Sequence, residues 1–152
     1  MSTYLVRHAK AGSRKTWNGD DFERPVSPSG RKQADAMAAR LVDAGLTSLW
    51  SSPYVRCIET LEPLADLVGL PIHADERLAE GARFEDTLEL LEESGEGAVL
   101  CTHGDVLQEV AAALTRRGTR MVGEADWRKG TIWVLEREGE AFGTARPEPP
   151  PA

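Results

Sequence analysis

Two of the histidines in this chain each follow a short apolar run, a context that suits phosphoryl transfer. His8 comes just after the run 4–6. His103 comes just after the run 98–102. Short apolar runs of this kind predict buried strands, and open α/β folds bind their ligands at the carboxyl ends of parallel strands. We therefore expect the two imidazoles to lie together at one edge of a sheet.

Phosphoryl transfer needs a nucleophile in line with the leaving oxygen and cations around the three equatorial oxygens. His8 is the candidate nucleophile, because neutral imidazole is a competent covalent catalyst near neutral pH. Arg7 and Arg56 would hold phosphate oxygens through bidentate charge-assisted hydrogen bonds, which lysine replaces poorly. His103 would stabilise the transferring group electrostatically. The helix N-terminus predicted at Gly104 would add its partial positive charge and bind phosphate.

The elements that must position these residues alternate between strands and helices. Apolar runs predict strands at 4–6, 49–51, 71–73, 98–102 and 131–136, and helical spacing predicts helices from an N-cap at Ser29 to Gly45 and at 53–68, 84–91 and 106–114. This alternation predicts a three-layer α/β/α fold with a mainly parallel central sheet. The length suits one domain, assigned to 1–146. The Pro-rich tail 147–152 is expected to be disordered.

A long polar loop, 10–28, follows the first predicted strand. Loops of this length in compact domains are usually functional. Its candidate phosphate or leaving-group contacts are Lys10, Ser13, Lys15, Trp17 and Asn18. A second basic segment, 115–130, can be read either as a solvated linker or as a segment that faces the substrate.

Four short motifs occur in an order that resembles one known family. They are Arg7-His8-Ala9, Ser51-Ser52-Pro53-Tyr54-Val55-Arg56-Cys57, Leu78-Ala79-Glu80 and Thr102-His103-Gly104. Over 3–132 the chain resembles the small branch of the histidine phosphatase superfamily, which contains phosphoglycerate mutases and SixA-type phosphohistidine phosphatases. The segment 20–25 followed by Gly30 is more similar to SixA-type enzymes, and to the phosphatase domain fused to some actinobacterial MutT-type Nudix hydrolases. The family's usual Arg-His-Gly is Arg-His-Ala here, as in SixA-type members.

The resemblance implies a phosphatase with a phosphoglycerate mutase-like fold that hydrolyses phosphate esters through a phosphohistidine on His8. It places Glu80 at the family's acid position, where a carboxylic acid can protonate the leaving alkoxide. Other carboxylates, Glu76, Glu85 and Asp86, lie nearby in sequence. Three alternatives stay open: a SixA-type protein phosphohistidine phosphatase, a mutase, and a non-catalytic phosphate-binding module of the same fold. The expected partner is accordingly a phosphomonoester, a nucleotide or a phosphohistidine protein.

No cofactor and no metal are expected. The carboxylates of the segment 20–23 lie beside Arg24 and are typical of a solvated or salt-bridged loop, and the two histidines flanked by arginines would repel a divalent ion. Cys57 and Cys101 have neither metal-ligand spacing nor a redox pattern, and neither begins the phosphate loop that a cysteine nucleophile needs. We expect both thiols to be buried.

Charge and composition narrow the function classes. The chain has 18 basic and 25 acidic residues and a formal net charge of −7, which argues against nucleic acid as a main partner. Its apolar runs are shorter than a membrane helix, and no signal peptide precedes the first predicted strand. A cytoplasmic protein without membrane association is therefore expected. The sequence leaves the oligomeric state open.

Overall fold

Strands and helices alternate along residues 2–151, which are the residues that the computed structural model describes. The strands are β1 (Ser2–Arg7), β2 (Ser48–Ser51), β3 (Ile72–Ala74), β4 (Ala98–Thr102), β5 (Arg120–Met121), β6 (Ile132–Glu138) and β7 (Ala141–Glu148). The helices are α1 (Pro28–Leu41), α2 (Val55–Val68), α3 (Phe84–Ser94) and α4 (Gly104–Arg116), with 3₁₀ turns η1 (Asp21–Glu23) and η2 (Glu76–Leu78). Each predicted strand and helix is present, with differences at the ends, whereas β5 and β7 have no counterpart among the predicted elements.

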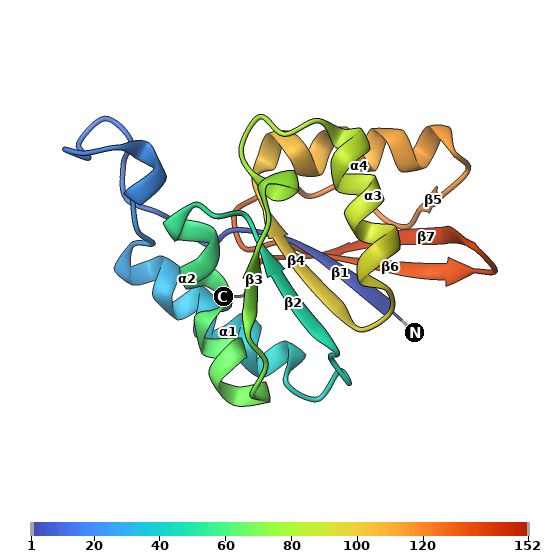
Figure 1. The fold of residues 1–152 in the computed structure, drawn as a ribbon, viewed down its shortest axis with the longest axis horizontal. Coiled ribbons are helices and arrows are strands. Elements are labelled where there is room, and N and C mark those ends of the chain that lie inside the picture. Colours follow the sequence, from blue (N-terminus) through green and yellow to red (C-terminus); the bar gives the residue numbers. More distant parts are fainter. Residues whose placement is uncertain (1, 152) are drawn as a thin grey trace.

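All the described strands join one sheet, and helices cover both of its faces (Figure 1). The strand order is β3-β2-β4-β1-β6-β7-β5. Strands β1, β2, β3 and β4 are mutually parallel where they pair, as are β5 and β7. The pairs β1 with β6 and β6 with β7 are antiparallel. The predicted three-layer α/β/α fold with a mainly parallel sheet is confirmed.

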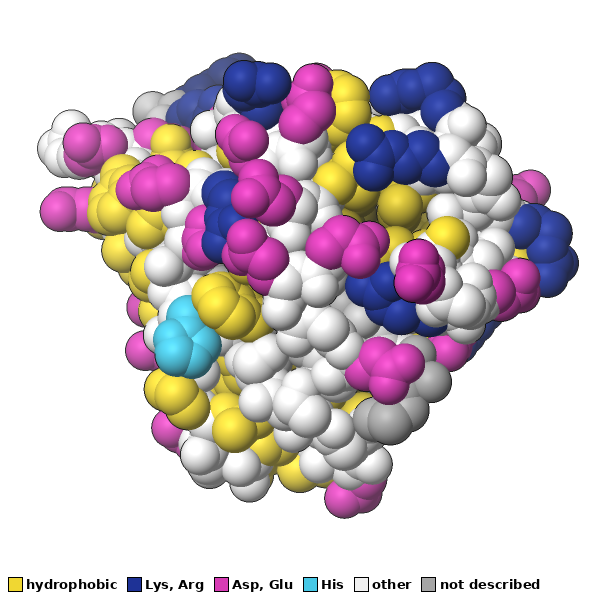
Figure 2. Space-filling view, turned by 45° about the vertical axis from the view of Figure 1, so that its right-hand side comes forward, with side chains coloured by type: hydrophobic (Ala, Val, Ile, Leu, Met, Phe, Trp, Pro, Cys, Tyr) yellow, Lys and Arg dark blue, Asp and Glu magenta, His cyan; other side chains and the backbone are white. Residues whose placement is uncertain are grey.

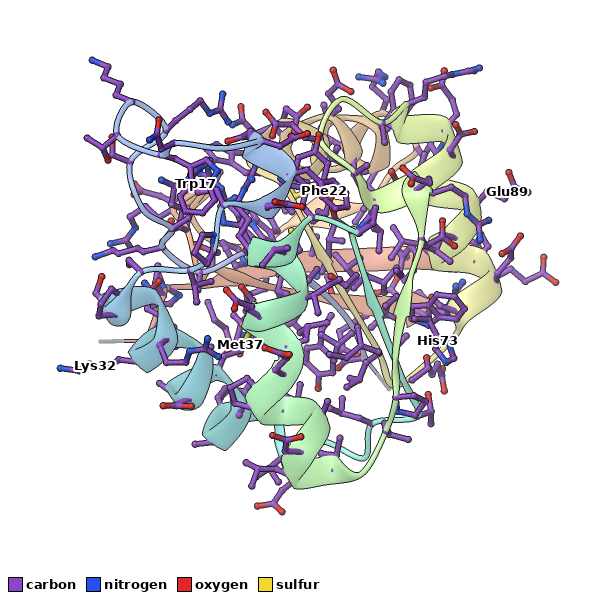
Figure 3. The ribbon with its side chains drawn as sticks, turned by 60° about the vertical axis from the view of Figure 1, so that its left-hand side comes forward. Trp17, Phe22, Lys32, Met37, His73 and Glu89 are labelled. Atoms are coloured by element: carbon purple, nitrogen blue, oxygen red, sulfur yellow. The ribbon has the colours of Figure 1, made fainter. Side chains whose placement is uncertain are left out.

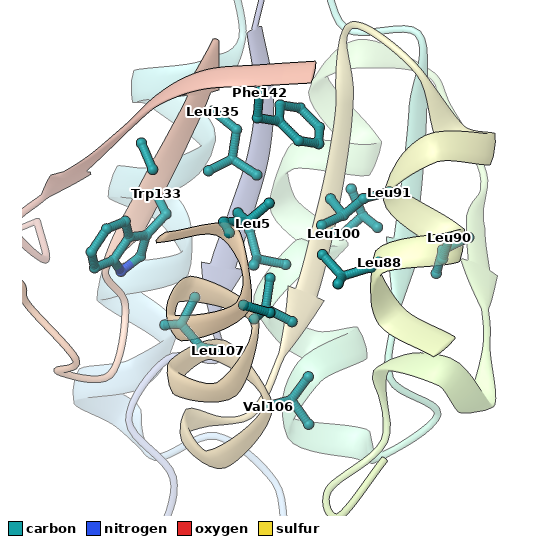
Figure 4. Packing of buried hydrophobic residues seen from close by; sticks show 14 of the residues in the cluster. Leu5, Leu88, Leu90, Leu91, Leu100, Val106, Leu107, Trp133, Leu135 and Phe142 are labelled. Atoms are coloured by element: carbon teal, nitrogen blue, oxygen red, sulfur yellow. The ribbon is translucent and has the colours of Figure 1, made fainter. Parts of the chain in front are cut away.

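The sheet has an apolar core on each face because successive strand residues point to opposite sides. Leu5 and Leu100 pair in register and pack toward α3 and α4 (Figure 4). Their neighbours Val6 and Cys101 pack toward α1 and α2. Strands β1 and β4 are thus buried on both sides. Strand pairing and apolar packing fix their carboxyl ends relative to each other.

The start of α1 holds the loop that follows β1. Ser27, not the predicted Ser29, is the N-cap, and its Oγ accepts a hydrogen bond of 3.1 Å from the Gly30 amide. The sequence prediction was wrong by two residues because Pro28 occupies the first helical position, which needs no amide hydrogen. A Cβ at Gly30 would lie 1.8 Å from the Lys10 carbonyl oxygen, so only glycine lets the helix pack this closely on the loop.

The C-terminal end is more ordered than its composition predicts. Pro147 and Glu148 belong to β7 and pair with Trp133 and Ile132 of β6, so the disordered tail and the domain boundary at 146 were wrong at these two positions. Proline is tolerated there because β5 pairs with β7 only at residues 144–145, which leaves Pro147 on an open edge. The final residue of the predicted tail, Ala152, lies outside the described residues.

Charged side chains of both signs are spread over the face shown in Figure 2. Figure 2 shows acidic and basic side chains intermixed on the face that it presents, with no continuous basic patch there. No helix within residues 2–151 has both the length and the apolar character needed to cross a bilayer. The expected absence of a nucleic-acid partner and the cytoplasmic location stay predictions.

Candidate active site

The carboxyl ends of β1 and β4 bring the two histidines together. These strands are parallel neighbours, with Arg7 opposite Thr102, and the His8 amide donates a hydrogen bond of 3.1 Å to the Thr102 carbonyl. The ring centroids of His8 and His103 lie 5.4 Å apart, and the two rings are arranged edge to face. The expectation that these histidines meet at one edge of the sheet is confirmed.

An open cavity of about 730 Å³ lies at this edge. Most of the residues predicted to act on phosphate or bind it line the cavity: Arg7, His8, Ser13, Lys15, Arg56, Glu80, His103 and Gly104. Three of the predicted residues, Lys10, Trp17 and Asn18, do not line it, which is a correction to their expected contact with the phosphate or the leaving group.

Other lining residues were missed by sequence reasoning: Arg14, Arg24, Asp105, Gln108 and Lys129. Arg14 belongs to the polar loop, whose length had already indicated a functional segment. Lys129 comes from the basic segment 115–130, and its position favours the substrate-facing interpretation for that end of the segment. Nothing in the local pattern around these residues separates them from ordinary surface charges.

His8 is held in the form that a nucleophile requires. Its Nδ1 lies 2.8 Å from the Ala9 carbonyl oxygen, and because a carbonyl only accepts, Nδ1 carries the proton and Nε2 keeps the lone pair. Burial lowers the pKa of His8 to about 3; the Ala9 hydrogen bond opposes this shift, while His103, Arg56 and Arg7 add to it. The imidazole is therefore neutral near pH 7, with a free lone pair on a residue that lines the cavity.

Arg7 reaches the cavity beside Gly104, at the start of α4. One guanidinium nitrogen donates a hydrogen bond of 2.5 Å to the Trp127 carbonyl, and burial lowers the pKa of Arg7 from the ordinary arginine value. A Cβ at residue 104 would lie 2.8 Å from the guanidinium carbon of Arg7. Glycine at this helix start is therefore what allows the guanidinium to lie across it.

Replacement of Gly104 by alanine is expected to lower kcat/KM for phosphate esters by about 10²-fold, the usual cost of losing one oriented donor to a reacting oxyanion. The added methyl group must displace Arg7. Steady-state kinetics measures the loss, and Glu109→Ala, an exposed change on the same helix, is the matched control. Unchanged kinetics in a folded Gly104→Ala protein would remove Arg7 from the phosphate site.

Arg56 is buried and already engaged by carboxylates. It is 1% exposed, and it donates to Glu80 Oε2 at 2.6 Å and to Asp21 Oδ2 at 3.2 Å. Arg24 donates to the other Asp21 oxygen at 2.9 Å, which confirms the salt-bridged character expected for the segment 20–23. Burial would raise the pKa of Asp21, but the Arg24 hydrogen bond and the neighbouring arginines hold it below its ordinary value. Among residues 2–151, no three His, Cys, Asp or Glu side chains are grouped as a metal site would require.

His103 is the N-cap residue of α4 and is fixed from the side away from the substrate. Its Nε2 lies 2.8 Å from Ser52 Oγ, which also accepts a hydrogen bond from the Tyr54 amide. Its Nδ1 is buried without a hydrogen-bond partner among the described residues and lies 3.9 Å from Glu80 Oε2. Ser52 was missed as a functional residue, although it stands inside one of the recognised motifs. Nδ1 is thus the nitrogen left to meet a phosphoryl oxygen.

The family model described as histidine phosphatase superfamily (branch 1) matches residues 3–82, more than half of the chain. The chain belongs to this superfamily. The 8-oxo-(d)GTP phosphatase of Mycolicibacterium smegmatis is 37% identical over 153 residues, a match that covers 96% of this chain and 48% of that protein. The chain thus spans about half the length of this relative. The family and the phosphatase relative together support assignment of the chain as a phosphatase.

Two solved structures share the fold of this histidine phosphatase. The protein histidine phosphatase SixA complexed with tungstate superposes with a TM-score of 0.76 at 19% identity, covering 97% of this chain and 94% of that one. A mycobacterial glucosyl-3-phosphoglycerate phosphatase superposes with a TM-score of 0.69 at 18% identity, covering 97% and 95%. At these identities the likeness shows the fold alone. The expected closeness to a domain fused to Nudix hydrolases stays a prediction.

The polar loop of this histidine phosphatase folds back on itself, which explains why part of it misses the cavity. The Trp17 indole donates a hydrogen bond of 2.9 Å to the Asp20 carbonyl, so its ring is held against the loop's own backbone and does not line the cavity (Figure 3). Asn18, at the tip of this turn, is exposed, and Lys10 is fixed at the base of the loop where its backbone contacts Ser27.

The two cysteines and the third histidine, His73, lie outside the cavity lining. Cys57 and Cys101 are buried free thiols, as expected, and neither lines the cavity. Cys57 Sγ lies 3.5 Å from His103 Nε2, behind the imidazole. Burial would raise the pKa of this thiol, but its neighbours Cys101 and His103 lower that pKa from the ordinary cysteine value. His73 is exposed on β3, where its ring lies 4.9 Å from that of Trp50 (Figure 3).

Proposed function

We propose that this chain is a metal-independent phosphatase that hydrolyses small phosphate esters through a phosphohistidine on His8. One observation carries the proposal. Three buried nitrogens have no hydrogen-bond partner among the described residues: Arg7 Nε, Arg56 Nε and His103 Nδ1. All three belong to side chains that line the same cavity as His8. Buried polar groups are almost always paired, so three unpaired donors around a neutral imidazole favour an anion with several oxygens.

In the first step, the lone pair on His8 Nε2 attacks phosphorus, and the bond from phosphorus to the leaving oxygen breaks. Arg7, Arg56 and His103 hold the equatorial oxygens, where charge accumulates in the transition state. Glu80 protonates the leaving alkoxide. In the second step, water attacks the phosphohistidine, its proton passes to the Glu80 carboxylate, and the bond from nitrogen to phosphorus breaks to release inorganic phosphate.

The ion pairs of Glu80 hold its carboxylate beside Arg56, in the lining of the cavity. Without substrate, Glu80 bridges Arg56 at 2.6 Å and Arg14 at 3.3 Å. A bound phosphoryl group would compete for Arg56 and move the carboxyl group toward the leaving oxygen. The adjacent Gly81 amide donates to Asp105 Oδ2 at 2.9 Å and ties this loop to the start of α4. The carboxyl group therefore stays at the mouth of the cavity when it leaves the arginine.

The substrate class that we propose is a small phosphoester, with nucleotides included. The cavity is rich in cations, and Ser13 and Lys15 in its lining are exposed, so its volume leaves space for a leaving group beyond the phosphoryl group. The Mycolicibacterium smegmatis relative is named for a nucleotide substrate, and this adds nucleoside phosphates to the compounds worth testing.

Brief reaction with phosphorus-labelled substrate, followed by denaturation, is expected to leave a label on His8 that is stable in alkali and lost in acid. The label should be absent from His8→Asn, and peptide mapping identifies its position.

Activity is expected to survive exhaustive chelation, and vanadate, which mimics the five-coordinate transition state, is expected to inhibit. A label on Cys57 or Cys101, or loss of activity with EDTA that Mg²⁺ or Zn²⁺ restores, would contradict the proposal.

A further inference from the structure

A second basic cavity lies beside the catalytic one. Its volume is about 560 Å³, and it is lined by Arg7, Lys10, Gln33, Arg128, Lys129, Pro150 and Pro151. Arg7 and Lys129 line both cavities, so the two spaces are neighbours. The lining of the second cavity includes four cationic residues and no carboxylate. This cavity has no role in the mechanism described above.

The two lysines of this cavity are uncompensated cations. Across residues 2–151, neither the Lys10 nor the Lys129 ammonium forms an ion pair with a carboxylate. Arg128 differs, because Asp126 holds its guanidinium at 2.6 Å. Burial lowers the pKa of Lys129, and repulsion from Arg7 and the other arginines of the site adds to the shift. An anion between the lysines would relieve this repulsion.

One buried side chain fixes the position of both lysines. Gln33 is 8% exposed; its Oε1 accepts a hydrogen bond of 2.9 Å from the Lys10 amide, and its Nε2 donates one of 3.3 Å to the Lys129 carbonyl. Gly130, at φ +87°, passes so close to Gln33 that a Cβ there would lie 3.1 Å from Nε2. Gln33 therefore holds the backbones of Lys10 and Lys129 together on one side of the cavity. This arrangement of the backbone does not depend on the lysine side chains.

We propose that this second cavity binds a second phosphoryl group of the substrate, while the reacting phosphoryl group lies against His8. The favoured substrates are then small bisphosphorylated molecules whose two phosphates are separated by a short spacer. This inference rests on the proposed function and names the substrate class for the same site. The two ammonium groups balance the charge of a phosphate dianion, and Arg7 lines both cavities. Lysine, as a point charge, accepts the group without a fixed orientation.

The test compares alkanediol bisphosphates, from ethanediol to hexanediol, with the monophosphate of each diol. We expect the wild-type protein to prefer at least one bisphosphate over its monophosphate by about tenfold or more in kcat/KM, the usual value of one charge-assisted hydrogen bond. Lys10→Gln should lower that ratio toward one. Lys32→Gln removes the same charge from an exposed position on α1 outside both cavities, and it should leave the ratio unchanged (Figure 3).

Binding to the His8→Asn protein decides the inference without turnover. Calorimetry should show tighter binding of the preferred bisphosphate than of its monophosphate, and a further Lys10→Gln change should remove the difference. Equal ratios and equal affinities across the spacer series would overturn the inference, while a phosphate label on His8 would leave the proposed function standing. Absence of both label and hydrolysis, with bisphosphate binding that depends on Lys10, would overturn the proposed function and keep the second binding site.

Discussion

Replacement of His8 by asparagine is expected to lower kcat for phosphate esters by about 10⁴-fold or more, because it removes the nucleophile and closes the covalent route. The asparagine amide can still donate to the Ala9 carbonyl, as Nδ1 of His8 does at 2.8 Å, so the cavity wall should survive. His73→Asn is the matched control, since that imidazole is exposed on β3 and outside the cavity.

Steady-state kinetics measures the loss, and the thermal unfolding midpoint shows that both variants fold. Residual activity in His8→Asn within tenfold of the wild type would exclude His8 as the nucleophile. Direct attack by water at the same arginine-lined site would then be the mechanism to test.

The low pKa of His8 also gives a pH dependence with a definite sign. With a pKa of about 3 in the folded protein, below the ordinary value of 6.5, the unfolded chain binds the His8 proton first as the pH falls. Wild-type protein should therefore lose free energy of unfolding relative to His8→Asn as the pH falls from about 6.5 toward 3. Urea unfolding of both proteins at pH 7 and pH 4.5 measures this, and an identical difference at the two pH values would contradict it.

Glu80→Gln is expected to slow hydrolysis of alkyl and nucleoside monophosphates by roughly 10²–10⁴-fold, the usual range for loss of a general acid. These substrates expel a strongly basic alkoxide that needs a proton. Nitrophenyl phosphate expels a stable anion and should lose much less. A phosphohistidine peptide should also lose little, because its leaving nitrogen can take a proton from solvent near neutral pH.

Asp21→Asn is the matched control for Glu80→Gln. Both changes remove one carboxylate from Arg56, at 3.2 Å for Asp21 and 2.6 Å for Glu80, but of these two carboxylates Glu80 alone lines the cavity. A loss that depends on the leaving group in Glu80→Gln alone would mark small phosphoesters as the substrates that the site is built for. Small and equal effects on every substrate would remove Glu80 from the mechanism and favour the phosphohistidine-protein alternative.

Local patterns were sufficient to predict the layers of this fold and the meeting of His8 and His103 at one edge of the sheet. The runs 4–6 and 98–102 are short, apolar and each followed by a histidine, and strands buried on both faces must have that composition. Parallel neighbours place their carboxyl ends at one edge, so His8 and His103 follow from the alternation of strands and helices. Arg7 follows as well, because it precedes His8 in the chain.

The C-terminal strand shows where local patterns fail. Gly143, Arg146 and Pro147 break the period expected of a strand, so no strand was predicted over β7 and its last two residues were assigned to the tail. Its place depends on pairing with β6 over most of its length and on burial of Phe142 and Ala145, at 5% and 1% exposure. Tertiary burial here outweighs the low strand propensity of the segment.

The sequence by itself determined which residue types could carry phosphoryl transfer and at which strand ends they lie. Only the tertiary structure decided that Ser52 contacts the His103 ring and that Gly104 leaves space for the Arg7 guanidinium. It also decided that Gln33 joins the segments of Lys10 and Lys129. The physical reason is the range of the interactions. Strand and helix patterns arise from burial and backbone sterics among near neighbours, whereas these contacts join segments far apart in the chain, whose approach is set by how the helices and loops pack around the sheet.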